Sequence, residues 1–211
     1  MSPRRRALGL AALSAAALAG CGTLSNEAPR FEFFVIEDLR PLAEPSSAPP
    51  RSPRSLLLTT GPAQALYDSD RIVFTRDGAG RAYYQYSNWS ERPARRVLAL
   101  AEARLARGGG LRSVAQTLAG VRGDIVLSLR LDELIHDDSA SPGVVRAAVT
   151  AEMVDWRTRT LVARRTFVQR APVPTRDARG AAAAANVAVT ALLDELAPWV
   201  EASAASIRAA D

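Results

Sequence analysis

The sequence has few of the residues that catalytic and metal-binding sites require. Its 211 residues contain one cysteine, one histidine and no lysine. A single cysteine excludes a disulfide within the chain, and a single histidine lacks the partners of a metal cluster or of a histidine-based triad. All 27 basic residues are arginine, a bias that we attribute to a GC-rich genome rather than to a binding site.

The glycine-rich and acidic motifs are also incomplete. Gly108-Gly109-Gly110 is not followed by the Lys-Ser/Thr of a phosphate-binding loop, and we expect it to end a helix. Gly78 and Gly80 belong to a predicted hairpin turn and do not complete a dinucleotide-binding motif. The pair Asp194-Glu195 is expected on the solvated face of a helix.

His136 is expected in a polar turn over residues 136–143, in which Asp137 and Asp138 are typical turn-forming residues. The sequence offers no nucleophile–base pair, so a periplasmic hydrolase is not supported. We therefore predict that the protein is not an enzyme. We also expect no catalytic residue, no metal and no dissociable cofactor.

The N-terminus has the parts of a secretory signal. Arg4–Arg6 form a basic region, and Leu8–Leu18 form an apolar region without charge. This apolar run is too short to cross a hydrocarbon core of about 30 Å as a helix. The sequence Leu18-Ala19-Gly20-Cys21 resembles the lipobox of bacterial lipoproteins, and residues 1–20 are predicted to be a signal peptide.

The lipobox resemblance implies lipidation of Cys21, whose covalent lipid would be the only bound group. Residues 21–30 would be the lipidated N-terminus and tether, residues 31–204 the folded domain, and residues 205–211 a C-terminal tail. In lipoproteins of Gram-negative bacteria, an aspartate after the cysteine usually signals retention at the inner membrane. This chain has Gly22 there, so we expect an anchor on the periplasmic face of the outer membrane, with the inner membrane less favoured.

The charge of the chain does not indicate a nucleic-acid partner. Three of the arginines behind the net charge of +5 lie in the predicted signal peptide, so the high pI is partly a property of a segment that is removed. Beyond this segment, the sequence pattern shows no apolar run of membrane-spanning length. The mature chain is long enough for one domain with a substantial core.

Alternation and turn signals predict a protein rich in strands. Strands are expected at residues 31–36, 55–60, 71–76, 81–86, 127–131, 145–153 and 161–168. The third and fourth flank Asp77-Gly78-Ala79-Gly80 and should form a β-hairpin. The last three should form an antiparallel meander, and residues 111–123 are ambiguous between a short strand and a turn.

Two helices are expected. Apolar residues at helical spacing over 94–105 predict the first, with Asn88 or Ser90 as its N-terminal cap. A long alanine-rich helix should begin at Asp177, and Pro198 should kink it or end it. The element order predicts an α+β fold, with a single mixed, mostly antiparallel sheet and both helices packed on one face.

The ordered motifs resemble one family, the ABC-type transport auxiliary lipoproteins (PqiC-like). The lipid-bearing cysteine is followed by the aromatic strand Phe33–Ile36 and by the segment Leu66–Val73, which lacks the family's spacer between Asp-Arg and a β-branched pair. Tyr84–Pro93 is similar to the family's tyrosine-rich hairpin and helix start, with Ser90 in place of the usual alanine and Arg92 inserted before the proline. The later strands and the last helix follow in the same order.

The resemblance implies a periplasm-facing accessory lipoprotein that works beside an MCE-domain protein and an ABC-type permease. Such systems are thought to move phospholipids or other hydrophobic molecules between the two membranes, and the implied role is non-catalytic docking. A ring-like homo-oligomer is also implied. The alternative is a lipoprotein subunit of a secretion or envelope-assembly complex, because small mixed-sheet domains of this order occur there too.

An aromatic group provides one candidate contact surface. Alternation along a strand places Tyr84 and Tyr86 on one face and Tyr83 on the other, and Trp89 follows. One face could serve the core and the other a partner or an oligomer interface. Simple strand packing, with a tryptophan that seats the helix, is the favoured alternative.

Charged residues provide two further candidates. Asp70 and Arg71 could form a local ion pair at the start of a strand. A set of arginines could contact phospholipid headgroups or could equally line a solvated strand face: Arg157, Arg159, Arg164, Arg165 and Arg170.

Overall fold

A computed structural model describes most of the chain from residue 30 onward, namely residues 30–40, 44, 49–62, 64–117, 120 and 122–207. The predicted signal peptide, Cys21 and nearly all of the tether lie outside these residues. Phe31–Asp211 forms one compact unit.

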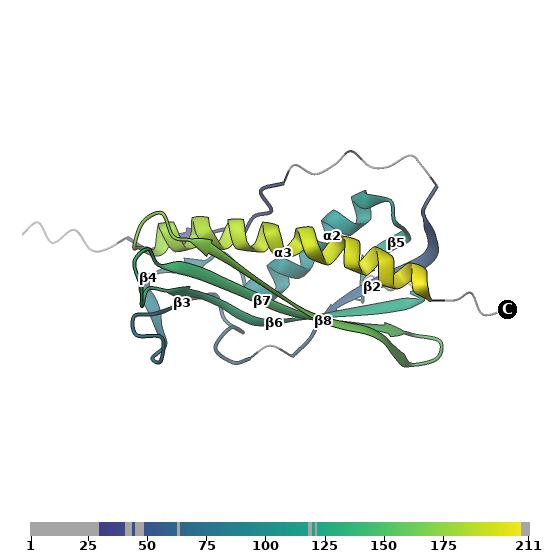
Figure 1. Cartoon of the computed structure of the whole chain (residues 1–211), viewed down its shortest axis with the longest axis horizontal. Helices are drawn as coiled ribbons and strands as arrows, with labels where there is room; N and C mark the ends of the chain where they lie inside the picture. Colours follow the sequence, from purple (N-terminus) through teal and green to yellow (C-terminus); the bar gives the residue numbers. More distant parts are fainter. Residues whose placement is uncertain are drawn as a thin grey trace, which may run out of the picture. The chain divides into compact units, whose positions relative to one another are not determined.

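This unit is an α+β fold with a mixed, curled sheet of eight strands (Figure 1), as the sequence predicted. Its elements follow in the order β1 (Glu32–Phe34), β2 (Ser52–Thr60), β3 (Arg71–Thr75), β4 (Ala82–Trp89), α2 (Pro93–Gly108), β5 (Leu111–Gln116), β6 (Ile125–Asp137), β7 (Val144–Asp155), β8 (Thr160–Pro172) and α3 (Ala178–Ser206). The ambiguous segment after the first helix therefore begins with a strand.

The longest pairings form the predicted antiparallel meander. β6 pairs with β7 along its whole length, and β7 pairs in turn with β8. Alternation places Leu127, Leu129 and Leu131 of β6 in the core, each at most 3% exposed. The predicted hairpin is also present, since β3 and β4 are antiparallel and Gly78 of the turn has a φ of +77°, which favours glycine.

The second edge of β6 is shared by two other strands. β2 runs parallel to its first half, where Leu56 pairs with Ile125, and β3 runs parallel to its last residues, where Val73 pairs with Ile135. β5 extends the sheet beyond β2, while β4 and then β1 extend it beyond β3. β6 therefore joins two small groups of strands to the meander.

Helix α2 begins at Pro93, whose missing amide proton costs nothing in a first turn. The expected cap was wrong: Arg92 occupies the N-cap without a side-chain bond, because β4 continues through Asn88 to Trp89. The glycine run ends the helix as predicted, with Gly109 in the left-handed conformation at a φ of +67°.

Helix α3 begins where the sequence placed it. The side chain of Asp177 accepts a hydrogen bond of 2.7 Å from the amide of Gly180, which is an N-cap. The helix does not end at Pro198 and continues to Ser206. By length and composition it is long and apolar enough to cross a membrane, contrary to the expectation from the sequence pattern. Most of its apolar residues are nevertheless buried in the core.

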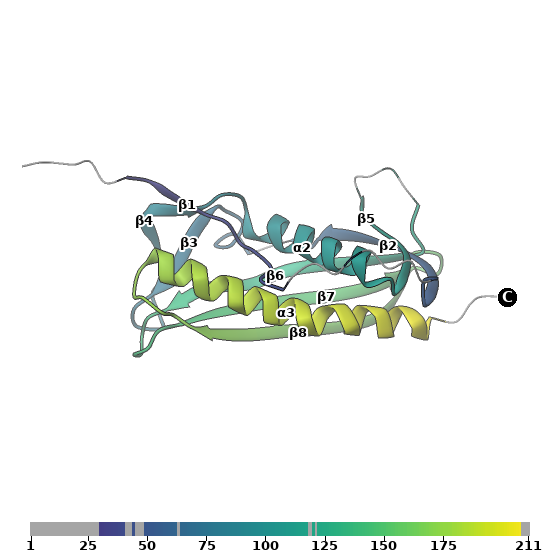
Figure 2. The same cartoon turned by 90° about the horizontal axis from the view of Figure 1, so that it is seen from above.

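The two helices contact each other and the sheet. α3 packs along β7 and β8, and α2 packs on β2, β5 and β6. Figure 2 shows them side by side, with the segment after β1 running toward the space between them. Small residues of α3 allow its backbone to approach the sheet closely, and the fully buried ones include Ala184, Ala185 and Ala188.

Candidate functional site

The segment that follows β1 is bound to helix α3. We call residues 36–40 the N-terminal strap. The amide of Glu37 donates to Oδ1 of Asn186 at 3.0 Å, and the amide of Leu39 donates to Oγ1 of Thr190 at 2.8 Å. Both acceptors lie one helical turn apart on α3, so the strap follows the direction of this helix.

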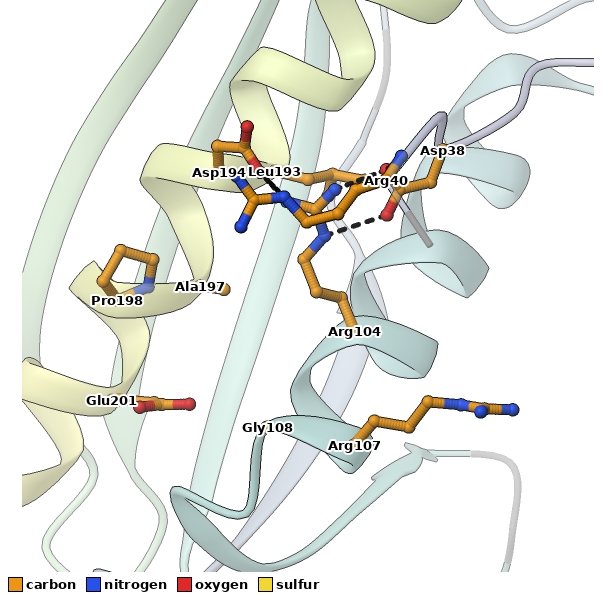
Figure 3. Close-up of a pocket in the computed structure, with 10 residues that line it drawn as sticks. All are labelled: Asp38, Arg40, Arg104, Arg107, Gly108, Leu193, Asp194, Ala197, Pro198 and Glu201. Carbon is orange, nitrogen blue, oxygen red and sulfur yellow. Dashed lines mark hydrogen bonds and ion pairs between the residues drawn. The ribbon is translucent and has the colours of Figure 1, made fainter. Parts of the chain in front are cut away.

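Helix α2 holds the other side of the strap through two arginines. Nε of Arg96 donates to the carbonyl oxygen of Ile36 at 2.7 Å. Arg104 binds both carboxylate oxygens of Asp38, and its Nε–Oδ2 distance is 2.8 Å. Arg104 also pairs with Asp194 of α3 (Figure 3), so one guanidinium joins the strap and both helices.

We call Asp38, Arg104 and Asp194 the Arg104 cluster, and its first two members are largely shielded from solvent. The side chains of Arg104 and Asp38 are 11% and 5% exposed. Buried charges require such pairing, and the fork of a guanidinium matches a carboxylate in two bonds. Arg40 adds a more exposed contact to Asp194, with Nε and Oδ1 3.0 Å apart.

A cavity of about 280 Å³ lies beside this cluster, between the two helices (Figure 3). Its wall combines charges of both signs with a small apolar part, and is formed by Asp38, Arg40, Arg104, Arg107, Gly108, Leu193, Asp194, Ala197, Pro198 and Glu201. Carboxylates and guanidiniums neutralise each other here, and no nucleophile–base pair is present among these lining residues. The arrangement is suited to holding segments together or to a small polar group.

Gly110 has a packing role in addition to following the end of α2. A Cβ atom at this position would lie 2.3 Å from Cδ of Glu201, so the Glu201 side chain would have to move to admit it. Glu201 itself pairs with Arg51, with Nη1 and Oε2 3.5 Å apart. The glycine run therefore lets the end of α2 approach α3.

The expected position of His136 in a polar turn was wrong. This residue belongs to β6 and is 2% exposed, because the strand continues six residues beyond the alternating leucines, to Asp137. Its Nδ1 lies 2.7 Å from the hydroxyl of Tyr84. Burial lowers the pKa of His136 and raises the pKa of Tyr84 to about 12, so both side chains are neutral at pH 7.

The second ring nitrogen of His136 is buried without a hydrogen-bond partner. Its nearest charged neighbour is Oδ1 of Asp138 at 3.8 Å, and Asp138 pairs with Arg176 at 2.8 Å. Asp137 accepts two hydrogen bonds from Ser139, which lower its pKa. The two aspartates thus organise the turn, and His136 belongs to the core.

The structure separates the candidate aromatic residues. Tyr84 packs against Phe74 with ring centroids 4.8 Å apart, and Trp89 is buried. Tyr83 and Tyr86 are 36% and 38% exposed. Tyr86 therefore does not share the environment of Tyr84, in contrast to the simple alternation, because the pairing of β3 with β4 is irregular.

The charged candidate residues likewise make separate contacts. No ion pair joins Asp70 to Arg71, both of which are described; the guanidinium of Arg71 lies 4.6 Å from the ring centre of Tyr83. In the arginine set, Arg164 pairs with Glu152 and Arg165 with Glu195. Within residues 30–207 as described, no group of three metal-ligating side chains is present.

The sequence did not reveal the Arg104 cluster. Asp194, expected on a solvated face, is half-buried beside Arg104. Asp38 and Asp194 lie 66 and 90 residues from Arg104, so no local spacing could connect them. Cys21, the predicted lipidation site, lies outside the described residues.

Comparison with known proteins identifies one family. The family model described as the ABC-type transport auxiliary lipoprotein component matches residues 38–197. The match includes β2–β8, α2, most of α3 and the three members of the Arg104 cluster. No curated protein matches the chain.

Solved structures share the fold. Protein XCC0632 from Xanthomonas campestris, of the DUF330 family, is 22% identical, with a TM-score of 0.71 over 81% of this chain and 95% of that chain. An uncharacterized protein is 9% identical, with a TM-score of 0.62 over 81% and 99%. The hypothetical protein CT253 from Chlamydia trachomatis is 7% identical, with a TM-score of 0.54 over 74% and 100%.

Proposed function

Because the chain belongs to the ABC-type transport auxiliary lipoprotein family, we propose that it is an accessory component of an MCE/ABC-type system that moves phospholipids across the envelope. It is anchored in the outer membrane through Cys21 and acts in the periplasm as a non-catalytic docking component. The family match over residues 38–197 is the observation that carries this proposal.

Two features of the described residues support a docking role. The Arg104 cluster uses its charges to hold the strap to both helices, and its members are already paired with one another. The only histidine is buried beside Tyr84 and does not face a cavity large enough for a substrate. The arrangement therefore favours a binding surface over chemistry.

Lipidation is tested by mass spectrometry of the native protein. We expect the mature chain to begin at Cys21 and to carry the mass of fatty acyl groups, and we expect residues 1–20 to be absent. A Cys21→Ser variant is the control, since it removes the thiol that receives the lipid. An intact N-terminal peptide without acyl mass would contradict the anchor.

The choice of membrane is tested by density fractionation of the envelope. We expect the protein in the outer-membrane fraction, and we expect Gly22→Asp to move it to the inner-membrane fraction. Recovery of the unsubstituted protein in the inner membrane would contradict the proposed location.

The partner is tested by affinity purification of the full lipidated chain in mild detergent. Recovery of an MCE-domain protein with its permease is the expected result, and Cys21→Ser is the matched control. Recovery of a secretin-like pore protein would favour the secretion alternative instead. The mass of the purified complex also tests the proposed homo-oligomeric ring.

A further inference from the structure

Exposed apolar side chains gather on and beside β1. Phe31 and Phe33 are 60% and 64% exposed, and Val35 is 43% exposed. Tyr86 of β4 meets Phe31 edge to face, with ring centroids 5.7 Å apart. We call these four residues the β1 aromatic patch.

The two faces of β1 have opposite character. Glu32 pairs with Arg179 of α3 at 2.8 Å, and Phe34 lies under the same guanidinium, 5.8 Å from its carbon. Alternate residues of a strand point to opposite sides, so Phe31 and Phe33 point away from α3. Contacts with Arg179 of α3 thus occupy one face, while the other presents aromatic rings to solvent.

This exposure is unusual for the chain as a whole. Only 5 of the 211 residues are phenylalanine, and Phe31 and Phe33 are the most exposed large hydrophobic residues in the part of the chain that the structure describes. Phe167, in contrast, is 1% exposed. Adjacent exposed aromatic side chains usually mark a contact surface.

The position of the patch in the sequence indicates its occupant. Nine residues, 22–30, separate the predicted lipid-bearing Cys21 from Phe31. At full extension they span about 30 Å at most, and any bend shortens this distance. Arg30, directly before the patch, is exposed and would favour anionic headgroups. The patch is therefore held close to the membrane surface by the chain itself.

We propose that the β1 aromatic patch lies in the headgroup region of the bilayer that holds the lipid anchor. This inference rests on the anchor at Cys21 that the proposed function requires. Aromatic rings are well suited to this region, because it combines apolar and polar surroundings. Contact at β1 then sets the orientation of the domain, with the β7–β8 turn, which lies at the other end of the unit (Figure 1 and Figure 2), directed away from the membrane.

The test uses the full, lipidated chain and places one fluorescent reporter at each end of the folded unit. Phe33→Trp reports on the patch, and Leu161→Trp, at a residue 58% exposed beside the β7–β8 turn, is the matched control. Both variants are reconstituted into vesicles of phosphatidylethanolamine and phosphatidylglycerol, with acyl chains brominated close to the headgroups. The three native tryptophans give a constant background that the unsubstituted protein measures.

We expect brominated lipid to cause a loss of the emission added by Phe33→Trp, together with a shift to shorter wavelength on vesicle binding. The emission added by Leu161→Trp should be unchanged. If the protein floats with the vesicles but neither reporter is quenched, the patch proposal is overturned while the anchor stands. If the protein does not float with the vesicles, both proposals are contradicted.

Other occupants give different results in the same system. A second copy of the chain would shield the Phe33→Trp reporter from acrylamide in solution without vesicles, and a protein partner would do so when it is added. In both cases brominated lipid would leave the emission of this reporter unquenched. That pattern would overturn the lipid contact. Loss of the brominated-lipid signal at position 33 in a Phe31→Ser background would support contact by the whole patch.

Discussion

Arg104 shows how one side chain can hold three segments together. It lies between Asp38 of the strap and Asp194 of α3, and its side chain is 11% exposed. Removal of one partner from a buried ion pair typically costs about 3–5 kcal/mol, because a charge remains buried and unpaired. We expect Arg104→Leu to lower the free energy of unfolding by an amount in this range.

Denaturation in urea measures this loss, and Arg164→Leu is the matched control. Arg164 pairs with Glu152, but its side chain is 54% exposed, and such surface pairs contribute at most about 1 kcal/mol. If both substitutions lowered the free energy of unfolding equally, the Arg104 cluster would not act as a stabilising buried ion pair.

His136 gives the protein a specific response to acid. Burial lowers its folded-state pKa below the ordinary 6.5, while the unfolded chain keeps the ordinary value. The unfolded state therefore binds a proton more readily, and stability should fall as the pH drops below about 6.5. The nearby charges of Asp137, Asp138 and Asp177 oppose this shift, and Arg176 reinforces it.

The urea midpoint measured between pH 7.5 and 5 tests this response. We expect a decline that a His136→Gln variant lacks, even though the variant is less stable at every pH. The aspartates with lowered pKa values, such as Asp124 and Asp177, lose their contributions only at lower pH, below about 3.8. An unchanged slope in the variant would contradict the role of His136.

Among the elements, α3 depends on close contact at its first turn. A Cβ atom at Gly180 would lie 2.0 Å from the carbonyl oxygen of Thr175. Alanine normally favours a helix over glycine by about 1 kcal/mol, but overpacking costs about 1–3 kcal/mol. We expect Gly180→Ala to destabilise the protein despite the better helix propensity.

Thermal and urea unfolding measure the sign of this effect. Ala183→Gly, at an exposed position of the same helix, gives the contribution of helix propensity without a change in packing. A more stable Gly180→Ala protein would show that the loop before α3 can move away from the helix.

Local sequence patterns predicted the helices and strands well, whereas contacts between distant segments could not be predicted. The alternation of Leu127, Leu129 and Leu131 specified a strand of the meander, and the turn at Asp77–Gly80 specified the hairpin, because both signals lie within a few residues. The parallel pairing of β2 and β3 with one edge of β6 joins distant segments, and no local signal encodes it. His136 was misplaced because polar residues near it suggested a turn before the strand had ended.

At the scale of the whole molecule, the strap connects the segment nearest the anchor to the last helix. Leu39 depends on Thr190 for its amide hydrogen bond. Thr190→Val keeps the shape of the side chain and removes the acceptor. We expect the amide of Leu39 to exchange with deuterium about 2- to 10-fold faster, which corresponds to the loss of one hydrogen bond.

Hydrogen exchange followed by mass spectrometry measures this change. The amide of Ser52, which donates to the carbonyl oxygen of Gly110 at 2.9 Å, is the internal reference and should be unaffected. Uniform acceleration at both positions would indicate global destabilisation rather than local release of the strap.

The strap also imposes an order on biosynthesis. Its bonds to Asn186 and Thr190 span 149 and 151 residues, so they cannot form until almost the entire polypeptide is available to fold. On the export route that we propose, the N-terminal segment is therefore unattached to its own domain during translocation. Docking of this segment is then a final step of folding.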